Sequence, residues 1–297
     1  MSGEAARALL AGLVDYAGLF PPAALAMDEA VAEYARWRGS PEAFMLGRFV
    51  APAARLDELG RSAAALLEAG AGEPWRVSAL LGADAAADAA RIAAFDAAHA
   101  GRAMVDCVEL KTTGPAEAGA ALAALPAGLT AYVEVAPDAS LEATLAVLKQ
   151  HGARAKLRTG GLVAAAIPEP CDVARFIAAC AAAGVPWKAT AGLHHPVRAE
   201  QALTYEASSP RAVMHGFLNV FAAAVFARSG ADPALLEAVV SETRPQAFRF
   251  DSGSLAWREL RASAAQIAAA RRGFAASFGS CSFAEPVADL RALEVLS

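Results

Sequence analysis

The sequence predicts an α/β protein, a (β/α)8 TIM barrel with a helical C-terminal extension. Its 297 residues are ordinary for such a barrel, which commonly forms one domain of about 250 residues. Short β-rich runs alternate with alanine-rich stretches at helical spacing, which is typical of a parallel sheet covered by helices. We therefore expect a single domain over residues 1–297, with the barrel at about 15–228 and the extension at about 229–297.

Eight apolar runs are predicted to be the barrel strands, because each becomes polar mainly near its C-terminal end, as strands buried on both faces do. They are Tyr16–Phe20, Phe44–Val50, Trp75–Leu81, Met104–Leu110, Leu129–Val135, Arg154–Leu157, Val185–Ala189 and Ala212–His215. The predicted helices between them are Asp28–Arg38, Leu56–Ala69, Asp84–His99, Leu141–His151, Cys171–Ala183 and Phe217–Arg228.

In the extension, helices are expected near Pro233–Thr243 and Leu255–Gly273. Glycine follows several of the barrel's predicted helices, at the position where a left-handed residue ends a helix. A doubly wound open sheet is the alternative architecture. The sequence lacks the G-x-G-x-x-G and G-x-x-x-x-G-K-[ST] motifs that would favour a nucleotide-binding form of that fold.

Composition and charge limit the functional classes. The mean hydropathy of +0.35 is due largely to alanine, and the longest apolar run, Phe217–Ala227, is shorter than the ~18 residues of a membrane span. The net charge of −5 and the absence of a basic cluster argue against a nucleic acid partner. We expect a small-molecule substrate, with an anionic one as an alternative, and base rates favour a homodimer if the chain assembles.

The N-terminal sequence and the cysteines indicate a cytoplasmic protein. Glu4 and Arg7 do not fit a secretory signal, and the four cysteines form no C-x-x-C pair, which is typical of reduced thiols. Three of the four are expected only to pack.

Charged and polar residues gather where the predicted strands end. In a barrel the active site is built from these strand ends and the loops after them, and burying so much charge without a function is costly. The candidate residues are Glu109, Lys111, Glu134, Lys156, Arg158, Lys188, Thr190, His194, His195, His215 and Asn219.

Two strand-end lysines stand out among these candidates. Side chains alternate along a strand, so Lys188, between the apolar Trp187 and Ala189, is expected to point inward and to be partly desolvated near other cations. Both effects lower the pKa of a lysine and free its amine to attack a carbonyl. The alternative is that Lys156 and Lys188 only form ion pairs with Glu109 or Glu134 that hold the strands together.

The stretch from Tyr132 to about Ala202 resembles deoxyribose-phosphate aldolase and related class I aldolase barrels. In that family one strand ends K-T-S-T-G-F and the next ends K-A-S-G-G-I. Here Lys156-Leu-Arg-Thr-Gly-Gly and Lys188-Ala-Thr-Ala-Gly-Leu follow in the same order, about one βα repeat apart, and Glu134 matches the family's I-I-E. The resemblance implies that Lys156 forms a Schiff base and that Lys188 is its electrostatic activator.

This chain also departs from the family's pattern. Arg158 replaces a small hydroxyl residue, the His194–His195 pair has no counterpart, and Glu109-Leu-Lys111 stands where the family has D-x-V-I-N. His215-Gly216-Phe217 stands where the family has a phosphate-holding glycine-serine turn. With these departures, the resemblance implies shared aldol chemistry with a different substrate, or a shared barrel alone.

We therefore predict a metal-independent carbon–carbon lyase that acts on a small oxygenated carbonyl compound, with no cofactor. Lys156, Lys188, Glu109 and Glu134 form the catalytic set, and Glu109 or Glu134 moves protons. Arg158 and His195 hold an anionic substituent, and Lys111, Thr190, His194, His215 and Asn219 complete the substrate site.

Two alternatives stay open at this point. Glu109, Glu134 and a histidine can instead bind a divalent metal in an enolising enzyme, with a lysine as the base that enolises an acid, or in a hydrolytic one. The barrel can also be a non-catalytic ligand-binding protein.

Overall fold

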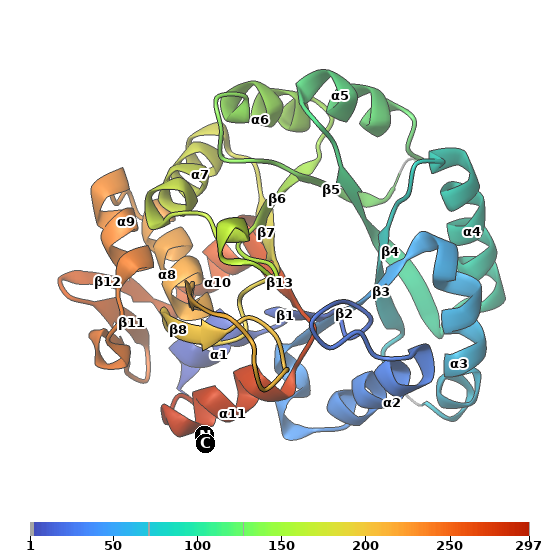
Figure 1. Cartoon of the computed structure of the whole chain (residues 1–297), viewed down its shortest axis with the longest axis horizontal. Helices are drawn as coiled ribbons and strands as arrows, with labels where there is room; N and C mark the ends of the chain where they lie inside the picture. The colour runs from blue at the N-terminus through green and yellow to red at the C-terminus, as the bar shows by residue number, and fades with distance from the viewer. Residues whose placement is uncertain (1–2, 71, 127, 297) are drawn as a thin grey trace.

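The computed structural model, which describes residues 3–70, 72–126 and 128–296, contains a closed barrel of eight parallel strands in the order β1-β13-β7-β6-β5-β4-β3-β2. Helices surround the barrel on the outside (Figure 1). The predicted (β/α)8 TIM barrel is confirmed.

The barrel strands are β1 (Val14–Tyr16), β2 (Leu46–Pro52), β3 (Trp75–Leu80), β4 (Ala103–Lys111), β5 (Thr130–Glu134), β6 (Arg154–Arg158), β7 (Trp187–Thr190) and β13 (Ala275–Ser280). The helices are α1 (Glu4–Leu10), α2 (Met27–Arg38), α3 (Leu56–Ala69), α4 (Ala85–Ala98), α5 (Pro115–Ala123), α6 (Leu141–Gln150), α7 (Pro170–Ala183), α8 (Phe217–Arg228), α9 (Pro233–Ser241), α10 (Ala264–Gly273) and α11 (Ala284–Ala292). Outside the barrel, β8 (Ala199–Ala202) and β9 (Arg211–Met214) form a hairpin, and β10 (Phe248–Phe250), β11 (Ser254–Trp257) and β12 (Leu260–Ser263) form a small antiparallel sheet.

The prediction that Ala212–His215 is the eighth barrel strand is wrong. That segment overlaps β9, which pairs antiparallel with β8, and the barrel is closed by β13 between β7 and β1. The physical reason is burial: Val213 on β9 is exposed, whereas Phe278 and Gly279 on β13 are buried on the closed sheet. The hairpin is an insertion between β7 and α8, and its β-rich sequence was mistaken for the next barrel strand.

The segment after residue 228 is therefore part of the barrel as well as an extension of it. It begins with α9, as predicted, but Leu255–Gly273 contains β11 and β12 before α10. It then supplies β13 and ends with α11. A second smaller shift concerns the first strand, which is Val14–Tyr16 and precedes the predicted Tyr16–Phe20.

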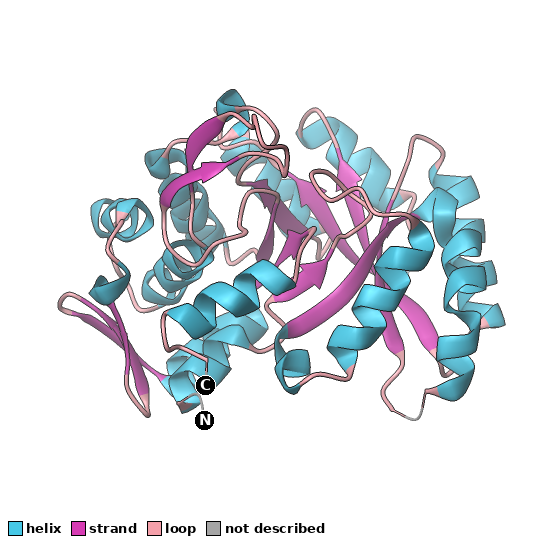
Figure 2. Cartoon of the chain, turned by 60° about the horizontal axis from the view of Figure 1, so that its bottom comes forward, coloured by secondary structure: helices cyan, strands magenta, loops and turns pink. Residues whose placement is uncertain are grey.

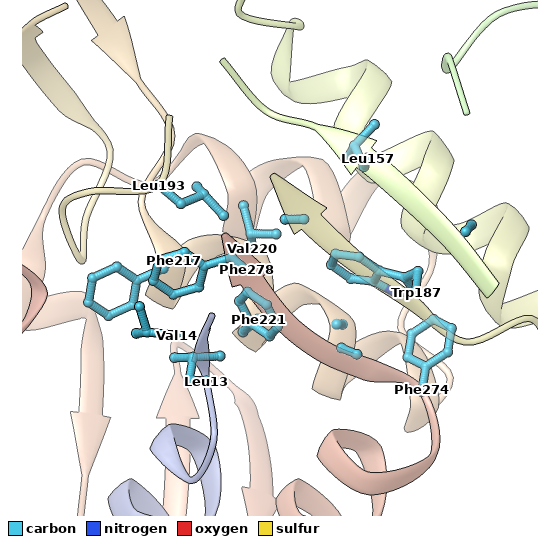
Figure 3. Close-up of a cluster of buried hydrophobic side chains, with 14 of the residues drawn as sticks. Leu13, Val14, Leu157, Trp187, Leu193, Phe217, Val220, Phe221, Phe274 and Phe278 are labelled. Atoms are coloured by element: carbon cyan, nitrogen blue, oxygen red, sulfur yellow. The ribbon is translucent and has the colours of Figure 1, made fainter. Parts of the chain in front are cut away.

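The packing of α8 against β7 and β13 decides which side chains point into the barrel. Trp187 on β7 is fully buried and stacks on Phe221 of α8 with ring centroids 5.7 Å apart. Phe278 on β13 stacks on Phe217 of the same helix at 5.3 Å. Figure 3 shows these rings in one cluster outside the strands. Because neighbouring residues alternate, Lys188 must point to the opposite side of β7, into the barrel.

None of the described helices is both long enough and apolar enough to span a membrane. The apolar run of α8 is instead buried between the barrel and its neighbouring helices.

Truncation tests whether the last part of the chain belongs to the barrel. A chain that ends at Arg228 lacks β13, so β1 and β7 lose their shared neighbour and the barrel stays open. We expect this chain to show no cooperative thermal unfolding by circular dichroism, whereas the full chain unfolds cooperatively. A cooperative transition in the truncated chain would contradict the assignment of β13 as the closing strand.

Candidate active site

A cavity of about 670 Å³ opens at the C-terminal ends of the barrel strands. The β8–β9 hairpin and the loops after β1 and β6 form its outer walls, and Figure 2 shows the hairpin beyond one end of the strands. Phe20, Pro21 and Pro22, in the loop after β1, line it. Eight of the predicted site residues also line it: Glu109, Lys111, Glu134, Lys156, Arg158, Thr190, His194 and His195.

The carboxylate of Glu109 on β4 joins the two strand-end lysines. Its Oε2 accepts a hydrogen bond from Lys156 Nζ at 3.1 Å, and its Oε1 accepts one from Lys188 Nζ at 2.7 Å. Ser78 on β3 donates a third, at 2.8 Å. Burial raises the pKa of Glu109, but the charges of the two lysines lower it by a larger amount. The pKa therefore lies well below its usual range, and the group is ionised.

Lys188 lies beneath the cavity and does not line it. The side chain is 1% exposed, and its Nζ also donates to Asp15 Oδ2 on β1 at 2.6 Å. Asp15 is itself fixed by Ser277 Oγ and the backbone N–H of Arg48. The expectation of a lowered pKa for Lys188 is wrong: burial lowers the pKa, but the charges of Asp15 and Glu109 raise it well above its usual range. Lys188 is a permanent ammonium group.

Of the two lysines that bind Glu109, only Lys156 lines the cavity. Its Nζ lies between the carboxylates of Glu109 at 3.1 Å and Glu134 at 3.2 Å, and the side chain is buried at the inner end of the cavity. Arg158, two residues later on the same strand and face, binds Glu134 from the solvent side at 3.1 Å. Burial raises the pKa of Glu134, but the charges of Lys156 and Arg158 lower it by a larger amount, so the pKa lies below its usual value. Glu134 is therefore a carboxylate with one partner in the cavity and one at its rim.

The remaining cavity residues form a polar rim. Lys111 at the end of β4 is exposed and makes no ion pair with any residue that the structure describes. His195 Nδ1 lies 2.6 Å from Asp289 of α11, and Thr190 ends β7. The Gly160 turn has a packing role, since a Cβ there would lie 2.8 Å from the Cα of Gly192.

Two predicted site residues lie away from the cavity, because the segment before α8 is not a barrel strand. His215 is buried and its Nε2 lies 2.7 Å from the carbonyl oxygen of Pro168. Asn219 donates to the carbonyl oxygens of Val239 and Glu242, and its own side-chain oxygen accepts from the backbone N–H of Arg198. These contacts join α8 to its neighbours.

Sequence reasoning missed four residues of this region. Asp15 is the lone acid in the apolar run Leu13-Val14-Asp15-Tyr16, and this is the signal that could have found it. Cys281 and Glu285 follow the misassigned last strand, and Tyr205 lies on the inserted hairpin. All three of these line the cavity.

Among the described residues, no group of three or more His, Cys, Asp and Glu side chains is placed to hold a metal ion. A cation bound by Glu109 and Glu134 would have to displace Lys156 from both carboxylates.

No protein-family model matches the chain, and no curated protein is significantly similar to it.

Substitution of Lys188 by Met tests the buried charge cluster. The change keeps most of the length of the side chain but leaves buried Asp15 without its lysine and Glu109 with Lys156 alone, so we expect the free energy of unfolding at pH 7 to fall by about 3–5 kcal/mol. Urea unfolding measures this loss. Lys149→Met, at an exposed position on α6, is the matched control and should change stability little.

The same variant should respond differently to acid. In the wild type the pKa values of Asp15 and Glu109 lie below 3.8 and 4.5, so their stabilisation is present above those values and is lost as the pH falls below them. Without Lys188, burial raises the pKa of Asp15 instead. Protonation of Asp15 then removes a buried unpaired charge and increases the stability of the variant. The deficit of Lys188→Met should therefore shrink between about pH 6 and pH 4. A deficit that stays constant over this range would contradict the ion-pair assignment.

Proposed function

We propose that this barrel is a class I carbon–carbon lyase, which cleaves or forms a bond next to a small carbonyl compound through an imine on Lys156. The observation that carries the proposal is the Glu109 carboxylate shared by a cavity-lining lysine and a buried one. The resemblance to class I aldolase barrels around these two lysines supports it, because that chemistry uses a lysine pair on neighbouring strands.

The unequal surroundings of the two lysines assign their roles. A nucleophile must reach the substrate, and Lys156 lines the cavity whereas Lys188 does not. Lys188 also holds its proton firmly between two carboxylates. It acts as a fixed positive charge that holds Glu109 in place beside Lys156.

Charge balance also favours an imine at Lys156. When the neutral amine of Lys156 adds to a carbonyl and water leaves, the protonated imine carries the positive charge that the ammonium group carried before. Glu109 and Glu134 therefore have a cation at Lys156 both before the reaction and once the imine has formed. The positive imine nitrogen then accepts the electron pair of the breaking C–C bond.

Glu134 is the residue best placed to move protons. Its Oε2 is 3.2 Å from Lys156 Nζ, and it is more exposed to the cavity than Glu109. It can take the proton that Lys156 must lose before attack and return it to the departing water. Lys111, Arg158 and His195 bring positive charge or N–H donors to the rim, which suits a substrate with an anionic group at the end away from the carbonyl.

Borohydride trapping tests the imine. The pure protein is incubated with pyruvate or propanal, reduced, digested and mapped by mass spectrometry. We expect one stable adduct on Lys156 and none in Lys156→Ala, while exposed Lys149 serves as the internal control for random reductive alkylation. EDTA should leave the yield unchanged. An adduct on Lys188 alone, or no adduct together with an EDTA-sensitive melting temperature, would contradict the proposal and favour the metal-dependent alternative.

Glu134→Gln tests the proton transfer. The amide keeps the shape but takes up no proton, so we expect the rate of adduct formation on Lys156 to fall by about 10²–10⁴-fold. Glu117→Gln, at a carboxylate outside the cavity lining, is the matched control. The measurement is the time course of trapping, and an unchanged rate would exclude Glu134 from the step.

A further inference from the structure

A second group of reactive side chains lines the same cavity. Cys281 directly follows β13, His194 lies in the loop after β7, Glu285 lies in the first turn of α11, and Tyr205 lies between β8 and β9. All four come from segments at the mouth of the barrel, whereas Lys156 and Glu109 lie deeper along their strands. The proposed imine chemistry uses none of them.

Their contacts form a chain that ends on the sulfur atom. Glu285 Oε2 lies 2.8 Å from His194 Nδ1, and His194 Nε2 faces Cys281 Sγ at 4.0 Å, within reach of a sulfur hydrogen bond. Tyr205 Oη lies 3.6 Å from the same sulfur and donates to Glu285 Oε2 at 2.9 Å. Glu285 thus orients the imidazole so that its second nitrogen is directed at the thiol.

The surroundings of His194 favour its protonated form. Burial lowers the pKa of His194, but its hydrogen bonds to Cys281 and Glu285 raise it to about 9. Burial raises the pKa of Glu285, but its contacts, the hydrogen bond from His194 first among them, lower it by a larger amount, so the pKa lies below its usual value. The imidazole is therefore protonated at neutral pH, and its Nε2 side faces the thiol.

The other cysteines have no such arrangement. Cys107 and Cys180 are buried, and burial raises the pKa of Cys107 to about 11 and that of Cys180 well above its usual value. Cys171 is exposed at the start of α7 and has no histidine contact within the described part of the chain. Cys281 is also buried, but it lines the cavity and faces His194, in which it differs from the other three.

We propose that Cys281 is a nucleophilic thiol, activated by His194 and Glu285, that binds small aldehydes in the cavity as reversible hemithioacetals. Sγ forms a bond to the aldehyde carbon, and the C=O π bond becomes a C–O single bond. The imidazolium of His194 donates a proton to the oxygen and regains one from the thiol, so the S–H proton is replaced by the O–H proton of the hemithioacetal. Tyr205 Oη, 3.6 Å from Sγ, can accept a hydrogen bond from the new hydroxyl while it donates to Glu285. The step needs no oxidant, no leaving group and no cofactor, and it is independent of an imine on Lys156.

Alkylation rates test the activated thiol. The native protein is treated with iodoacetamide at pH 7, and each cysteine peptide is followed by mass spectrometry, with Cys171 as the internal reference for an ordinary exposed thiol. We expect Cys281 to react at least about tenfold faster than Cys171. His194→Gln should abolish this advantage, and Glu285→Gln, a milder change at the protein surface, should reduce it.

Three results would overturn the activation. In the first, Cys281 reacts no faster than Cys171 in the wild type. In the second, Cys281 still reacts fast in His194→Gln. In the third, which decides if His194→Gln does not fold, Cys281 reacts as fast in Glu285→Gln as in the wild type.

Protection by propanal tests the aldehyde. We expect propanal to slow the alkylation of Cys281 saturably and to leave Cys171 unchanged. The same protection should persist in Lys156→Ala, where no imine forms at that position. Protection that is absent from the wild type, or that disappears in Lys156→Ala, would overturn the hemithioacetal, because the aldehyde would then act at the lysine or not at all.

Discussion

The carboxylate of Glu109, held between two ammonium groups inside the barrel, is the interaction on which the site depends. Lys156 and Lys188 are register partners on adjacent strands, so their charges would repel at close range without an acid between them. Glu109 reaches both from β4, and Asp15 adds a second acid from β1 on the far side of Lys188. The cluster joins β1, β4, β6 and β7 across the barrel interior, where most barrels have apolar layers.

The two lysines differ because the cavity reaches only one of them. Lys188 is enclosed by Asp15, Glu109 and the ring of Tyr132, whose centroid lies 5.5 Å from Nζ, and it cannot leave without uncovering two charges. Lys156 has the same acid on one side and Glu134 with the cavity on the other. A fixed charge below and an amine that lines the cavity above suit the carbonyl chemistry that we propose for Lys156.

The sequence was sufficient to predict the barrel and most of the charged residues at its mouth, because helix periodicity and strand alternation are local properties. Trp187 and Ala189 alone fix the direction of Lys188. The protonation of Lys188 was not predictable, since its partner Asp15 lies 173 residues earlier in the chain. The inserted hairpin β8–β9 has the composition of a barrel strand, and its second strand was therefore predicted to close the barrel. This wrong assignment added His215 and Asn219 to the predicted site and left out Cys281, which follows the true last strand.

The most direct test of this account is a crystal structure of the protein reduced by borohydride in the presence of pyruvate. The account predicts electron density continuous with Nζ of Lys156, with Glu109 still bound to Lys188 and Lys188 unmodified beneath it. Density joined to Lys188 instead, or a pyruvate held in the cavity without a bond to either lysine, would contradict the assignment of Lys156 as the nucleophile.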